Sequence, residues 1–240
     1  MKTVLLVASA ASAIVASANA GAVGFTAFTS IAGNGNRIID VFAVVSNAND
    51  RLLNVYNGNF SNNAGAAGAT FFIQQAGVNT RGWKPDGTAT RSNQIDSFMT
   101  IGVNGGAMEY GDYFGSLSTA ADGNFSSGWS TLGNTIPANA GWFLSPPTLP
   151  DNVAESMTTM TGTRVNLGPG GQASTLGVWC AHMVMAGSTT SCIWSATAAV
   201  KDGITGLNST VTVTSGEMIP APGALALLGL AGFASRRRRA

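Results

Sequence analysis

The side chains best suited to chemistry in this chain are close in sequence. They are Cys180, His182 and Cys192, its only cysteines and its only histidine. Any serine–histidine or cysteine–histidine catalysis would have to use His182. It lies in an apolar, strand-like segment, where a histidine is typical of packing rather than catalysis. No nucleophile elbow, zinc-protease motif or phosphate-binding loop accompanies it. The sequence therefore predicts no catalytic residue here.

The two cysteines flank a turn at Ala186 and Gly187. If the segments on either side form a hairpin, the sulfurs of Cys180 and Cys192 face each other, and the spacing then predicts a disulfide that closes a loop of about a dozen residues. Two buried free thiols are the alternative. Metal binding needs more ligands than these cysteines and one histidine supply, so no metal site and no cofactor are predicted.

Carboxylates offer a second chemistry, because a pair of them can hydrolyse a glycosidic bond. The candidates are Asp86, Asp96, Glu109, Asp112, Asp122 and Glu155. Aspartates followed by Gly or Asn, as in Asp86-Gly87, Asp122-Gly123 and Asp151-Asn152, are explained by turn geometry alone. Calcium binding by such loops is an alternative, although the EF-hand spacing is absent. The chain is therefore predicted not to be an enzyme, and a secreted glycoside hydrolase remains an alternative.

Aromatic rings in or beside predicted loops provide the clearest binding signal, at Trp83, Tyr110, Tyr113, Trp129 and Trp142. Flat rings at loop positions could stack on sugars, and the three tryptophans are the candidate glycan-stacking residues. Packing in the core or in turns is the alternative, because large aromatics dominate core energetics.

The elements that would position these residues are strands. Turn-forming Gly, Asn, Ser and Thr recur about every ten residues, and no convincing amphipathic helix appears. The predicted strands span residues 37–46, 51–57, 70–75, 96–103, 141–144, 175–185, 191–200 and 209–214. The first two read as a hairpin around a turn at 47–50. The pattern predicts an all-β fold, an antiparallel β-sandwich or jelly-roll-like single domain over 21–214, with a short tether at 215–219.

Charge excludes nucleic acid as a partner. Five of the twelve basic residues are Lys2 and Arg236 to Arg239, near the chain ends, so seven remain against eleven acids in the central domain. A weakly acidic domain with scattered charge lacks the basic patch that nucleic acid requires.

The N-terminus has the three parts of a secretory signal peptide. Lys2 gives a positive start, an apolar run reaches Val15, and Ala18-Asn19-Ala20 forms a small-x-small cleavage site. Residues 1–20 are predicted to be removed on export.

The C-terminus has a second three-part segment over residues 220–240. Pro220, Ala221, Pro222 and Gly223 precede an apolar stretch, and Arg236, Arg237, Arg238 and Arg239 follow it. The stretch is shorter than the roughly 20 residues that cross a hydrocarbon core comfortably. The arginines would hold their side in the cytoplasm, so we expect export to stall here and association with the membrane to be transient. A plain C-terminal membrane anchor is the alternative.

This arrangement resembles the PEP-CTERM sorting signal of Gram-negative bacteria, in which Pro-Glu-Pro precedes a short transmembrane segment and an arginine cluster. Ala221 stands where that family usually has glutamate. The resemblance implies export, processing by an exosortase-type membrane protease, and delivery to the cell surface or exopolysaccharide matrix. It implies a structural or adhesive role linked to biofilm. A carbohydrate-binding module that uses the loop aromatics is the first alternative.

Overall fold

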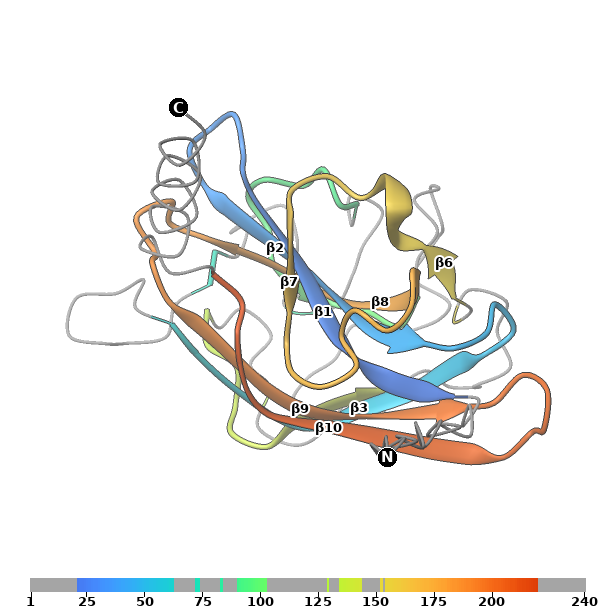
Figure 1. Ribbon diagram of the computed structural model, residues 1–240. Helices are drawn as coiled ribbons and strands as arrows, with labels where there is room; N and C mark the ends of the chain where they lie inside the picture. Colours follow the sequence, from blue (N-terminus) through green and yellow to red (C-terminus); the bar gives the residue numbers. More distant parts are fainter. Residues whose placement is uncertain are drawn as a thin grey trace, which may run out of the picture.

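The computed structural model describes residues 21–62, 72–73, 83, 90–102, 129, 134–143, 152 and 154–219. These residues form two antiparallel sheets, with a one-turn 3-10 helix at Met157–Thr159. The prediction of an all-β fold is confirmed. Figure 1 shows the two sheets as separate layers that cross at an angle.

The larger sheet has six strands in the order β4-β8-β2-β1-β7, with β6 also paired to β8. Its strands are β1 (Ala22–Ile31), β2 (Arg37–Val45), β4 (Phe98–Met99), β6 (Glu155–Ser156), β7 (Thr163–Asn166) and β8 (Leu176–Met185). The long strands β1, β2 and β8 lie side by side at its centre. Both faces of β2 and β8 are buried, which explains their nearly continuous apolar sequences.

The smaller sheet has four strands in the order β10-β9-β3-β5. They are β3 (Arg51–Asn62), β5 (Ala140–Phe143), β9 (Cys192–Lys201) and β10 (Asn208–Glu217). Strand β10 lies at one edge, and its side chains alternate between exposed and more buried positions over much of its length. This alternation is typical of a strand with one face towards solvent.

Aromatic side chains join the two sheets. The rings of Phe25 in β1 and Trp194 in β9 lie 5.6 Å apart, centroid to centroid. Trp142 of β5 donates its indole N–H to the carbonyl of Cys180 in β8, at 3.1 Å. The main core therefore lies between the sheets and is rich in tryptophan.

Both predicted hairpins are wrong, although most predicted strands are present. Strand β2 lies in the six-stranded sheet and β3 in the four-stranded sheet, and β8 and β9 are separated in the same way. The turns at 46–50 and 186–191 carry the chain from one layer to the other. Turn residues indicate that the chain reverses, but they do not specify which sheet receives the next strand.

The two ends of the described fold also differ from prediction. Strand β1 was not predicted, because its apolar residues follow directly on those of the presumed signal peptide. At the other end, β10 continues to Glu217, and Met218 and Ile219 are buried. The predicted tether at 215–219 is instead part of the folded domain.

Candidate functional site

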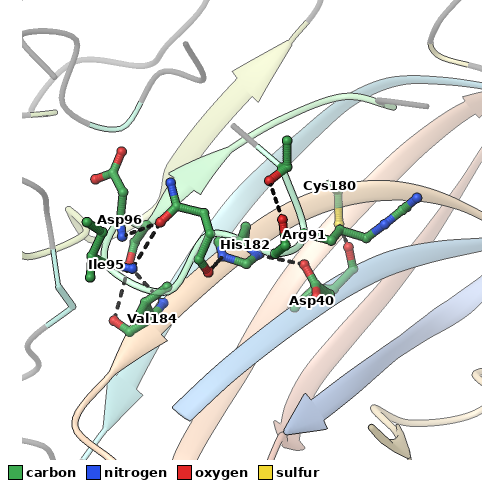
Figure 2. Close-up of polar contacts among 12 residues, drawn as sticks. Asp40, Arg91, Ile95, Asp96, Cys180, His182 and Val184 are labelled. Atoms are coloured by element: carbon green, nitrogen blue, oxygen red, sulfur yellow. Dashed lines mark hydrogen bonds and ion pairs between the residues drawn. The ribbon is translucent and has the colours of Figure 1, made fainter. Parts of the chain in front are cut away.

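The most developed polar arrangement in the described part of the chain surrounds His182, whose side chain is fully buried. Its Nδ1 lies 2.8 Å from Oδ1 of Asp40, and its Nε2 lies 3.0 Å from the backbone carbonyl oxygen of Asn93 (Figure 2). Asp40 and His182 are directly opposite in the pairing of β2 with β8. The sheet register therefore places this acid beside this base.

Both contacts of the imidazole are to oxygen atoms that accept hydrogen bonds. A neutral imidazole has only one N–H, so two such contacts need an additional proton on the ring or on the carboxyl group of Asp40. Either placement leaves the His182–Asp40 pair with no net charge, which suits a buried position. Both ring nitrogens are bound to the protein itself, so neither is free to take a proton from a substrate.

Aromatic rings enclose the histidine. The ring of Phe98 stacks on it with centroids 4.9 Å apart and a 20° interplanar angle. The ring of Trp179 lies nearly perpendicular to it, at an interplanar angle of 83° with centroids 5.9 Å apart. Phe98 lies opposite His182 in the pairing of β4 with β8. The imidazole is therefore enclosed by Asp40 of β2, Phe98 of β4 and Trp179 of its own strand.

That segment is shaped by its own polar residues. The side-chain Oδ1 of Asn93 accepts hydrogen bonds from the backbone N–H groups of Ile95 and Asp96, which closes a turn (Figure 2). Ser97 then bonds both backbone groups of Val184, donating to the carbonyl at 3.1 Å and accepting from the N–H at 2.8 Å. The turn presents the carbonyl of Asn93 to His182, so the site acts as a clamp that holds 90–102 against β8.

A second ionic contact borders the clamp. Nη1 of Arg91 lies 2.6 Å from Oε1 of Glu155, and the guanidinium lies over the ring of Trp179, 5.2 Å from its centroid. Burial raises the pKa of Glu155, and the nearby charge of Asp40 adds to this, against the opposing effect of Arg91. The site thus brings together two carboxylates, one guanidinium and one imidazole, held by four different segments: β2, β6, β8 and residues 90–102.

Sequence reasoning did not assign Asp40 or Arg91 to a site. The available signal was Asp40 itself, a lone acid within the apolar run from Ile38 to Val45. An acid that a strand pattern buries requires a partner. The partner could not be identified, because the pairing of β2 with β8 joins residues 142 positions apart.

The candidate glycan-stacking residues are buried core residues. Trp83, Trp129 and Trp142 are 2%, 8% and 1% exposed, respectively. The indole N–H of Trp129 donates to the carbonyl of Gly141, and that of Trp142 donates to the carbonyls of Thr100 and Cys180. The expectation that these rings face sugars is corrected: their size and apolar surface stabilise the core instead.

The predicted disulfide is also absent, and both cysteines are buried free thiols. Cys180 lies in β8 and Cys192 in β9, so they belong to different sheets, and the hairpin that would have joined them does not form. Burial raises the pKa of both thiols, and the carboxylate of Glu217 adds to this at Cys192.

We expect neither thiol to react in the folded protein, because a buried thiol with a raised pKa forms little thiolate. Without reductant, a thiol reagent should label the unfolded protein at two thiols per chain, the full cysteine content, and should leave the folded protein unlabelled. Mass spectrometry after labelling measures both states. Two thiols that appear in the unfolded protein only after reduction would indicate a disulfide and contradict the structure.

The other predicted features are covered only in part. Of the six candidate carboxylates, Asp96 and Glu155 are described, and Asp96 is buried. The remaining four, like the two terminal signals, lie outside the described residues. Within the described ranges, no three His, Cys, Asp or Glu side chains are grouped to hold a metal ion. No helix among those same residues is long and apolar enough to cross a membrane.

The turn between β9 and β10 borders an open cleft of about 710 Å³ that sequence reasoning did not anticipate. Its lining residues are Asn49, Arg51, Leu53, Lys201, Asp202, Gly203, Ile204, Thr205 and Gly206. Backbone N–H groups of Thr205 and Ile204 donate to Asp202 and hold the pKa of its carboxyl group below the ordinary value. These local hydrogen bonds stabilise the turn between β9 and β10.

The fold and the clamp define the protein as an all-β domain with an internal polar cluster. No protein-family model, curated protein or solved structure matches the chain.

Proposed function

We propose that this chain is an exported surface or matrix protein of a Gram-negative bacterium, with a structural or adhesive role in biofilm or exopolysaccharide. Its passenger is a β-sandwich of the jelly-roll type, and its partners are the export machinery, an exosortase-type protease and extracellular polysaccharide. The tail at 220–240, which resembles a PEP-CTERM signal, is the main sequence evidence for this proposal.

The observation that carries the proposal is where the end strands lie. Strand β1 begins at Ala22, two residues after the proposed cleavage at Ala20, and β10 ends at Glu217, three residues before Pro220. Cleavage at both proposed sites would leave all described strands whole. A passenger that is processed at both ends must have this property.

The edge strand β10 supports an adhesive role. Its first nine residues, Asn208 to Gly216, contain no charged residue and no proline, and five of them form the β-branched run Thr210 to Thr214. Soluble proteins often protect such an edge with lysine, proline or a bulge, because an open edge can pair with another strand. In the described structure, the feature that protects the edge of β10 is a bulge between Val213 and Gly216. The first six residues of β10 pair with β9 in regular register.

The alternatives have less support. A carbohydrate-binding module based on Trp83, Trp129 and Trp142 would need rings that face solvent, and these rings are buried. A hydrolase would need carboxylates placed around a substrate. The described acids beside His182 instead contact Arg91 and the imidazole, within the clamp.

Processing in a host that contains an exosortase tests the proposal. We expect the product to begin at Gly21, to lack Arg236 to Arg239, and to occur in the surface or matrix fraction. Replacing the four arginines with glutamine should leave an unprocessed C-terminus, because the positive flank that stops export is lost. Intact mass and N-terminal sequencing of each cell fraction measure the result.

Lys201→Gln is the matched control, since it removes an exposed positive charge outside the tail, and its processing should be normal. Protein that stays soluble inside the cell, with Met1 and all four arginines retained, would refute the proposal.

A further inference from the structure

The start of β1 is fixed to both sheets by one glycine and its neighbour. The backbone N–H of Gly21 donates to Oγ of Ser46 at 2.8 Å, and the carbonyl of Gly21 accepts from the N–H of Ser46. The N–H of Ala22 donates to Oγ of Ser209 in β10 at 3.0 Å. Residue 21 is thus held at the end of β2 and beside β10.

Only glycine suits this position. Gly21 is buried and has a φ of +124°, and a Cβ added to it would lie 2.1 Å from Oγ of Ser209. A side chain would therefore meet both backbone strain and a steric clash. The fold requires glycine at the residue that would become the N-terminus after cleavage at Ala20.

The hydroxyl that accepts from Gly21 also donates to a buried acid. Oγ of Ser46 lies 3.2 Å from Oδ2 of Asp50, whose residue is 0% exposed. Asp50 also accepts from the backbone N–H groups of Asn47 and Gly203, both at 2.9 Å. All three donors are neutral, and no cation of the described residues pairs with this carboxylate. A buried carboxylate without a positive partner is costly.

We propose that removal of the signal peptide provides this partner, in the form of the α-ammonium group of Gly21. The inference rests on the proposed export and on cleavage after Ala20. Hydrolysis adds the elements of water to the Ala20–Gly21 bond, leaving a carboxylate on Ala20 and an amine on Gly21 that binds a proton from solvent at neutral pH. The ammonium keeps the hydrogen bond to Ser46 and gains a charge.

The geometry allows a favourable interaction. One hydroxyl separates the nitrogen of Gly21 from the carboxylate of Asp50, through contacts of 2.8 and 3.2 Å. The two charges are therefore at most about 6 Å apart, a range in which opposite charges stabilise each other's ionised forms. Ser46 is exposed, so solvent weakens the interaction without removing it. Processing would thus stabilise the domain that it releases.

The test compares proteins that run from Gly21 to Ala240, prepared in vitro with a free or an acetylated N-terminus. Acetylation should lower the melting temperature by about 2–4 °C, the shift expected for about 1 kcal/mol in a domain of this size. In Asp50→Asn protein, acetylation should have little effect, because no carboxylate remains. Equal shifts with Asp50 and with the Asn variant, or no shift with either, would overturn the proposal.

A measurement on the unsubstituted protein covers the case in which Asp50→Asn does not fold. The carbon-13 chemical shift of the Asp50 carboxyl carbon should differ between free and acetylated protein at the same pH. An identical shift would overturn the ion pair. N-terminal sequencing of exported protein tests cleavage after Ala20 separately, so a failure of the export proposal and a failure of the ion pair give different results.

Discussion

Replacing Trp142 with alanine is expected to lower the free energy of unfolding by about 3–5 kcal/mol, the usual cost of removing a buried tryptophan. The ring is 1% exposed and lies about 6 Å from the rings of Trp129 and Trp194. Its N–H donates to the carbonyls of Thr100 and Cys180, which belong to the other layer. The substitution would open a cavity and remove a link between the sheets. Chemical denaturation followed by tryptophan fluorescence measures the loss.

The adjacent residue provides the control. Phe143 is 37% exposed and points to the opposite side of β5, so Phe143→Ala should cost far less. Trp142→Phe should fall between the two, because it keeps an aromatic ring but loses the N–H donor. If Trp142→Ala were as stable as the unsubstituted protein but no longer bound a glycan, the core assignment would be wrong and the stacking hypothesis would return.

Breaking the clamp at His182 should have the second largest effect. Asp40→Ala leaves a buried imidazole without its acidic partner, a change that costs about 3–5 kcal/mol when both groups are fully buried. The side chain of Asp40 retains 13% exposure, so we expect about 3 kcal/mol, at the lower end of that range. Equilibrium unfolding in urea measures the change.

A double-mutant cycle measures the interaction energy between Asp40 and His182 apart from their contacts with other residues. Asp40→Ala combined with His182→Ala should cost less than the sum of the single changes, with a coupling energy of about 1–3 kcal/mol. Glu217→Gln is the control, because this carboxylate is exposed and the hydroxyl and backbone N–H groups that donate to it are neutral, so the change should remain within about 0.5 kcal/mol. Additive costs would show that Asp40 and His182 do not act as a pair.

The clamp gives the buried ionisable groups a structural role. It ties the segment at 90–102 to β8 through the imidazole of His182, the carbonyl of Asn93 and the hydroxyl of Ser97. Loss of the clamp should therefore loosen this segment before the sheets separate. Hydrogen exchange of the Val184 N–H, which donates to Ser97, would report that local opening.

The amino-acid sequence by itself determined the fold class and most strand positions. Alternation and turn residues are local signals, and they located β2, β8, β9 and the main part of β10. The three-part patterns at the two ends are equally local, so the predictions of a signal peptide and a sorting signal depend on sequence alone. The lone acid at Asp40 was also visible, as a residue in need of a partner.

Only the tertiary structure decided which strands are neighbours. A turn such as 46–50 reverses the chain whether the next strand joins the same sheet or the opposite one, so both predicted hairpins were wrong. That choice depends on how the apolar faces of distant strands pack together. The arrangement of strands in two sheets separated Cys180 from Cys192 and buried Trp142. It also placed Asp40 beside His182, because side-chain pairing across a sheet follows register and not distance along the chain.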